Sequence, residues 1–184
     1  MLFRSTDNLV QSGETLTTGP VTVIGCGDTV SLCGVYDMGS SDFIAAGNVT
    51  LSCNTTILTS GGEIQFTGTV DGAYDLTLSA GGSSITFGGI IGGFSRIRDL
   101  VIENTSSVTA VSPIYAASIT GNIAGDSNFA GLNTNGLGGI TLRGNAFTFS
   151  GDLQATGSGS CFIENTGTLT VAAVNVAGTF TQEG

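Results

Sequence analysis

The side chains with the clearest potential for chemistry are four cysteines, Cys26, Cys33, Cys53 and Cys161. Thiolates bind zinc, but a site built from these residues needs all four, because the chain has no histidine and no CxxC pair. We therefore expect neither a metal site nor a cofactor. Cys33 and Cys53 lie 20 positions apart. If the chain coils with that period, neighbouring strands place them within disulfide range. Cys26 is a competing partner, and a row of reduced thiols in the core is the interpretation that we favour.

Carboxylates are the second candidates, because paired Asp or Glu side chains perform acid–base chemistry in enzymes that cleave glycans. The spacing does not pair them on one line of a coil with a 20-residue period, and Asp71 and Asp75 lie in a turn sequence. We therefore expect ordinary turn carboxylates and no catalytic residues. The carboxylates considered are Asp71, Asp75, Asp99, Asp126 and Asp152.

A polar stretch near 121–139 interrupts the apolar pattern and predicts a loop that projects from the fold. Loops on rigid scaffolds often carry binding function, although an ordinary insertion is the alternative. Its possible ligand or partner residues are Asp126, Asn128, Phe129, Asn133 and Asn135. Arg96 and Arg98 share a face and could bind a carboxylate of another copy, although a solvated strand face is the simpler expectation.

Two internal repeats indicate which architecture positions these residues. The sequence Ile-Glu-Asn-Thr occurs at 102–105 and again at 163–166, and Ile-x-Phe-x-Gly occurs at 64–68 and 85–89. The offsets are 61 and 21, so the longer one is about three times a period of 20–21 residues, as expected for a stacked-repeat fold. Ile102 and Ile163 should therefore lie on one line along the axis, three turns apart. Asn104 and Asn165 should turn corners, since asparagine tolerates left-handed backbone.

Short alternating runs bounded by glycine, asparagine, aspartate or serine fill most of the chain. They predict an all-β fold, a right-handed single-stranded parallel β-helix (a solenoid) of about 20–21 residues per turn. Residues 1–18 are expected to form an N-terminal cap or lead-in, and residues 19–184 the coil. The inward side chains of the clearest runs are predicted to be Ile64, Phe66, Leu76, Leu78, Ile85 and Phe87.

The charge balance limits the partners. The formal net charge is −10 and there are only four basic residues, so the chain cannot build the cationic face that nucleic acids require. The sequence contains no apolar run long enough for a membrane-spanning helix and no visible secretion signal. The alternating pattern continues to Gly184 without a capping sequence, as expected of a piece of a longer array or of an end that docks on another copy.

The stretch from Gly68 to Leu78, followed by Ser84 to Gly93, resembles the repeats of filamentous-haemagglutinin-type and autotransporter-passenger proteins of bacterial surfaces. Gly-Gly-Ile-Ile at 88–91 and Phe-Ile-Glu-Asn at 162–165 are weakly similar to motifs of polymorphic outer-membrane proteins. The resemblance implies a parallel β-helix that is secreted to the cell surface and acts in cell adhesion, without catalytic residues. Its partners would be a surface protein or glycan of a host or neighbouring cell, or other copies of itself. A filament subunit that stacks head to tail is the alternative, and a β-helix enzyme that cleaves glycans is the second alternative.

Overall fold

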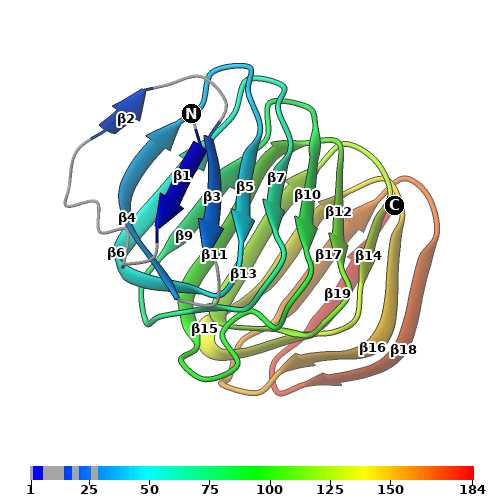
Figure 1. The fold of residues 1–184 in the computed structure, drawn as a ribbon. Helices are drawn as coiled ribbons and strands as arrows, with labels where there is room; N and C mark the ends of the chain where they lie inside the picture. The colour runs from blue at the N-terminus through cyan, green and yellow to red at the C-terminus, as the bar shows by residue number, and fades with distance from the viewer. Residues whose placement is uncertain (1, 6–14, 18–20, 26–28) are drawn as a thin grey trace.

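The chain folds into a coil of parallel β-strands in this computed structural model, which describes residues 2–5, 15–17, 21–25 and 29–184. From residue 29 onward the coil makes about seven turns of about 21 residues each (Figure 1). The described residues contain strands and turns but no helix, so no helix among them could cross a membrane. The predicted class, an all-β parallel solenoid with this period, is confirmed.

Each turn of the coil has three sides, and stacked sides form three faces, numbered in the order in which the chain passes them. Seven strands lie in the first face alone: β1 (Leu2–Ser5), β3 (Val21–Gly25), β5 (Phe43–Ala46), β7 (Ile64–Phe66), β10 (Ser84–Phe87), β12 (Ser107–Ala110) and β14 (Ser127–Phe129). The second face alone contains β8 (Val70–Asp71). The third face alone contains β2 (Thr15–Thr17), β9 (Leu76–Ser79), β11 (Ile97–Thr105), β17 (Cys161–Asn165) and β19 (Phe180–Glu183).

The remaining strands bend from one face into the next. Two run from the first face into the second: β16 (Phe147–Ala155) and β18 (Leu169–Val176). Four run from the second into the third: β4 (Val30–Asp37), β6 (Val49–Leu58), β13 (Ile114–Ile123) and β15 (Leu132–Gly144). Every pairing among these strands is parallel, so each turn of the coil forms hydrogen bonds with the turns before and after it.

Strand alternation points every second side chain into the coil, where it packs on its counterparts in neighbouring turns. The first face places Ile64 on Ile85 and Phe66 on Phe87 in register. The rings of Phe66 and Phe87 stack with centroids 5.8 Å apart, and Phe43 continues the row at 5.8 Å from Phe66. All six side chains predicted to point inward in this region are fully buried. Apolar burial along these rows is the main source of stability.

The duplicated Ile-Glu-Asn-Thr sequence marks the register of the coil. Ile102 pairs with Gly121, Gly121 with Leu142, and Leu142 with Ile163, so the two isoleucines lie on one line three turns apart. Their following asparagines differ. A register shift follows Ile102, and Asn104 is exposed there with a φ of 48°.

Asn165, the second of these asparagines, is instead buried. Its Nδ2 donates to the carbonyl of Gly167 at 2.6 Å, and its Oδ1 accepts from Gln182 at 3.0 Å. The same four letters therefore have equivalent isoleucines but different asparagine environments.

The predicted projecting loop near 121–139 is wrong, because this stretch forms regular strands of the coil. It contains the end of β13, all of β14 and much of β15, and Phe129 and Leu132 are core residues. Ser127 and Thr134 occupy inward positions and are buried with hydrogen bonds, which hides the alternation in the sequence. Only residues 135–138 bulge outward, between the parts of β15 that pair with Ala116 and Ser118.

Part of the N-terminal segment belongs to the same ladders. β1 pairs with β3 in the first face, and β2 pairs with β4 in the third. The other residues of the segment 1–18, predicted as a cap or lead-in, lie outside the described residues, as does Cys26.

Candidate functional site

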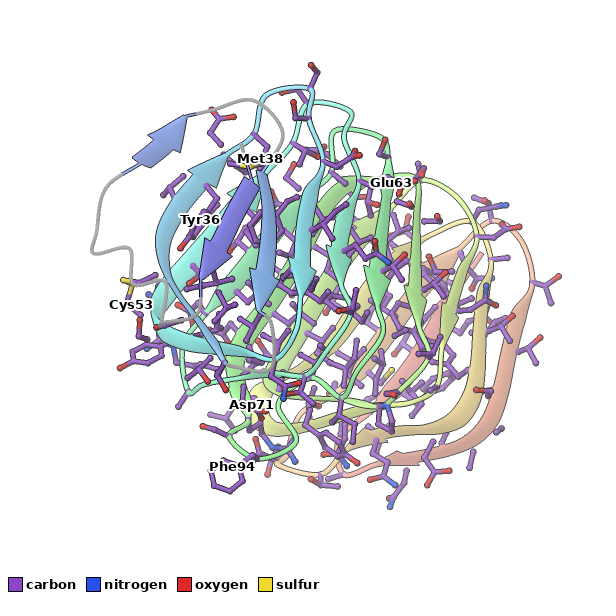
Figure 2. The ribbon with its side chains drawn as sticks, viewed as in Figure 1. Tyr36, Met38, Cys53, Glu63, Asp71 and Phe94 are labelled. Atoms are coloured by element: carbon purple, nitrogen blue, oxygen red, sulfur yellow. A yellow bond between two sulfur atoms is a disulfide. The ribbon has the colours of Figure 1, made fainter. Side chains whose placement is uncertain are left out.

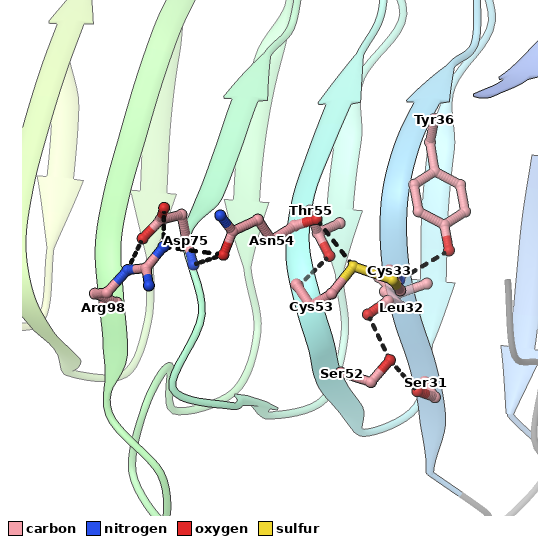
Figure 3. The surroundings of a disulfide bond; sticks show 10 residues. All are labelled: Ser31, Leu32, Cys33, Tyr36, Ser52, Cys53, Asn54, Thr55, Asp75 and Arg98. Carbon is pink, nitrogen blue, oxygen red and sulfur yellow. Dashed lines mark hydrogen bonds and ion pairs between the residues drawn. A yellow bond between two sulfur atoms is a disulfide. The ribbon is translucent and has the colours of Figure 1, made fainter. Parts of the chain in front are cut away.

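The edge between the second and third faces gathers most of the features that could contact a partner. The structure joins Cys33 and Cys53 there in a disulfide with a Cα–Cα distance of 4.8 Å, in place of the favoured pair of reduced thiols (Figure 3). The backbone N–H of Cys33 also donates to the Tyr36 hydroxyl at 3.3 Å. The bond connects the turn that contains β4 to the turn that contains β6, near the N-terminal end of the coil. It therefore staples two neighbouring turns.

A polar network continues along the same edge from the disulfide (Figure 3). The guanidinium of Arg98 forms a bidentate ion pair with Asp75 and donates a further hydrogen bond to Oδ1 of Asn54 at 3.1 Å. The Arg98 guanidinium lowers the pKa of the Asp75 carboxyl and, in return, the carboxylate raises the pKa of Arg98. The network connects three successive turns and so belongs to the scaffold of this edge.

The segment that projects from the coil is 92–96, and it carries Phe94. The side chain of Phe94 is 98% exposed and points away from the coil (Figure 2). One carboxylate oxygen of Asp71 accepts the backbone N–H groups of Phe94 at 2.8 Å and of Ser95 at 3.0 Å. The N–H of Gly92 donates to the carbonyl of Val70 at 2.6 Å. Both ends of the projection are therefore hydrogen-bonded to the preceding turn, which holds Phe94 in a defined position.

Gly92 fixes the start of this projection. Its φ is +69°, and a Cβ added there would lie 2.0 Å from the carbonyl oxygen of Tyr115. Only glycine avoids both the left-handed strain and this clash. At the other end, Nη1 of Arg96 donates to the carbonyls of Ala116 at 3.2 Å and Asn133 at 2.7 Å, so this side chain is turned back onto the coil. Burial lowers the pKa of Arg96, while its interaction with Tyr115 acts in the opposite direction.

Other apolar side chains are exposed along the same edge. Tyr74 is 39% exposed one turn before Phe94, and Leu137 is 83% exposed in the outward bulge of β15. We name these three residues, Tyr74, Phe94 and Leu137, the Phe94 edge. Large apolar side chains that are fixed and exposed are typical anchor residues of binding surfaces.

The second face contains a groove of about 300 Å³ beside this edge. Its outward row stacks Tyr115, Asn133 and Gln154 from three successive turns. Nδ2 of Asn133 donates to Oε1 of Gln154 at 2.5 Å, and Nε2 of Gln154 donates to Asp152 at 2.9 Å. The guanidinium of Arg96 lies 5.4 Å from the centre of the Tyr115 ring. We name this feature the Tyr115 groove.

A second, larger groove of about 720 Å³ follows the edge between the third and first faces. Small and polar residues of four turns line it, among them Ser79, Gly81, Asn104 and Asn122. It contains no aromatic or charged side chain. It therefore offers shape but few groups that could select a ligand.

The five candidate carboxylates do not converge on one site. Each has a structural partner: Asp71 accepts from the 92–96 segment, Asp75 pairs with Arg98, Asp99 accepts from Ser118, Asp126 accepts from Asn145, and Asp152 accepts from Gln154. Within the described part of the chain, no group of three or more Cys, Asp or Glu side chains could hold a metal ion.

The residues predicted as a partner loop are likewise dispersed. Asn128 lies in the outward row of the first face, Phe129 is in the core, and Asp126 lies in the turn before β14. Asn133 lines the Tyr115 groove, and Asn135 lies in the bulge of β15. Only Asn133 and Asn135 therefore lie near the edge described above.

The other sequence candidates also have intramolecular partners. Arg98 and Arg96 contact their own coil and not a free solvated face, and Arg143 pairs with Glu164 at 3.0 Å. Cys161 is a fully buried free thiol, and burial raises its pKa to about 12.

Sequence reasoning did not identify Phe94, Tyr115 or Gln154 as surface features. The register contains a signal for Phe94: the step from Ile64 to Ile85 is 21 residues, whereas the step from Ile85 to its partner Val108 is 23. The longer step locates extra residues in the turn that carries Phe94.

Comparisons of the chain with protein-family models, with curated proteins and with solved structures found no match.

Proposed function

We propose that this chain is a non-catalytic structural and adhesive module of a secreted bacterial surface protein. The observation that carries the proposal is the Phe94 edge: a fully exposed phenylalanine on a hydrogen-bonded projection of a rigid coil. Its partner is a surface protein or glycan of a host or neighbouring cell. The coil supplies the shaft, and the edge supplies the contact.

The energetics of exposure support an adhesive role for Phe94. Burying a phenylalanine side chain gains about 1.5–3 kcal/mol. The projection is already fixed by Asp71, so a partner that covers the ring does not have to order the segment first. A pre-organised aromatic side chain is therefore an efficient anchor for a binding partner.

The non-catalytic part of the proposal is supported by the carboxylates, since each candidate is hydrogen-bonded or ion-paired within the scaffold. A location outside the cell is supported by the disulfide, because such bonds persist in oxidising compartments. The resemblance to autotransporter-passenger repeats points in the same direction.

The test is adhesion of beads coated with the purified chain to intact bacterial and epithelial cells. Phe94→Ser should weaken adhesion by about 10- to 100-fold in apparent Kd, which corresponds to the burial energy of the ring. Val111→Ser is the matched control, since Val111 is 64% exposed between the first and second faces, away from the Phe94 edge. Equal adhesion of the two variants, or no adhesion of the unmodified chain, would contradict the proposal.

A self-assembling filament subunit is the second candidate, and the last turn of the coil favours it. The inward row of that turn is partly uncovered, with Val174 44% and Phe180 40% exposed. The strands β18 and β19 also present unpaired hydrogen-bonding groups on one side in the described chain. A second copy stacked on this end would cover both. Electron microscopy of the purified chain should then show fibres, and Val174→Asp should abolish them; single rods at high concentration would exclude this candidate.

A further inference from the structure

We propose that the Tyr115 groove binds a neutral saccharide. This inference rests on the proposed adhesive function and names the ligand class of one surface of the module. The groove combines an aromatic ring, two amides and a carboxylate in one row of adjacent side chains. Its volume of about 300 Å³ lies at the lower end of the range for small-molecule sites.

The hydrogen-bond chain across the groove fixes which groups remain for a ligand. Asn133 uses one amide hydrogen on Oε1 of Gln154, and Gln154 uses one amide hydrogen on Oδ2 of Asp152. Each amide group has two hydrogens, and each amide or carboxylate oxygen has two lone pairs. The row therefore keeps donors and acceptors close together, with the amides held in defined orientations.

Hydroxyl groups match this pattern because each is both a donor and an acceptor. Neighbouring hydroxyls of a sugar ring can donate to Asp152 or to Oδ1 of Asn133 and accept from the free amide hydrogens. A ligand with only acceptors or only donors would satisfy half of the row. The chemistry therefore favours a polyhydroxylated ligand over an ordinary apolar side chain of a protein partner.

The charges of the groove select against anions. Asp152 is exposed and presents an anionic oxygen in the groove, and the chain as a whole has a net charge of −10. The one nearby cation, Arg96, already donates to two backbone carbonyls and faces the Tyr115 ring. A sulfated or carboxylated sugar would meet repulsion without a free cation to offset it, so the ligand is neutral.

The shape of the groove is set by backbone packing. Gly131 and Gly151 form part of its lining, and a Cβ at Gly151 would lie 2.0 Å from the carbonyl oxygen of Ala130. Pro113 and Tyr115 provide rigid apolar surface on one side. The apolar face of a sugar ring can pack on the aromatic ring while its hydroxyls reach the amides. The site is therefore preformed and open, consistent with weak binding of a single sugar unit.

The test is an NMR titration of the isotope-labelled chain with defined sugars. Lactose, maltotriose and chitotriose are the neutral probes, and sialyllactose and a heparin disaccharide are the anionic ones. At least one neutral probe should shift the amide side-chain signals of Asn133 and Gln154. Gln154→Ala should weaken that binding at least tenfold, because it removes the central donor and acceptor of the row.

Asn175→Ala is the matched control. Asn175 follows Gln154 in the same outward row, one turn further along, and is not part of the groove. It should bind like the unmodified chain, and thermal unfolding of both variants would verify that they are folded. Equal binding by Gln154→Ala, preference for an anionic probe, or no shift with any neutral probe would overturn the saccharide proposal. Cell adhesion that persists in the absence of sugar binding would refute only this inference and leave the adhesive function in place.

Discussion

Removal of the disulfide should destabilise the coil by about 3 kcal/mol, the entropy model's value for closing a loop of this length. Cys33 and Cys53 are 20 residues apart and join two successive turns, so the bond closes one turn of the coil in the unfolded chain. Their side chains are half-buried, and serine at both positions should add little desolvation cost. The hydrogen bond from the backbone N–H of Cys33 to Tyr36 does not depend on the sulfur.

The assay is urea unfolding of the oxidised chain and of the double variant Cys33→Ser/Cys53→Ser, followed by circular dichroism. The expected loss corresponds to a decrease in Tm of about 6 to 12 °C for a chain of this size. Reduction of the unmodified chain should reproduce the effect of the double variant. Cys161 is the internal control, because its buried thiol should resist alkylation in the native protein.

A loss below about 1 kcal/mol would refute the reasoning, since the entropy model requires about three times as much. A non-reducing peptide map that lacks the linkage between Cys33 and Cys53 would refute it at the level of the bond itself.

Three further predictions concern single side chains of the coil. Phe66→Ala should cost about 3–5 kcal/mol in the free energy of unfolding, measured with urea, because it opens a cavity in the stacked phenylalanine row. Arg98→Gln should remove stability that is present above the ordinary pKa of 3.8 of Asp75 and is lost as pH falls through its lowered folded value. Acid titrations of the two chains should therefore differ at neutral pH and converge below that value. Asn104→Gly should raise Tm and Asn104→Ala should lower it, each by an energy of about 1 kcal/mol, because the φ of Asn104 is left-handed.

The fold could be predicted because two kinds of signal agreed. The repeat offsets give the period, and the alternation in runs such as 64–66 and 85–87 gives the inward rows, so Ile64 and Ile85 fall in register as expected. The register over three turns also follows, since Ile102 and Ile163 lie on one line. Apolar periodicity is a property that the core imposes on the sequence directly.

The surface could be predicted much less well. In the stretch 121–139, Ser127 and Thr134 take inward positions that apolar residues hold elsewhere, and their hydrogen bonds compensate for burial. Counting apolar residues therefore mistook strands for a loop. The true projection carries Phe94 between glycines and arginine, and composition alone does not separate it from an ordinary turn; only the 23-residue step reveals it. The Tyr115 groove depends on which outward residues stack, and that requires the register.

The disulfide has a mechanical consequence for a coil pulled from its two ends. Backbone hydrogen bonds connect successive turns, so tension along the axis would peel the coil one turn at a time. Each detached turn of about 21 residues releases roughly 75 Å of chain at full extension. The turn enclosed by Cys33 and Cys53 cannot lengthen in this way while the bond is intact. Under load, the oxidised chain would therefore extend by one step fewer than the reduced chain, and this turn would act as a fixed-length link near one end.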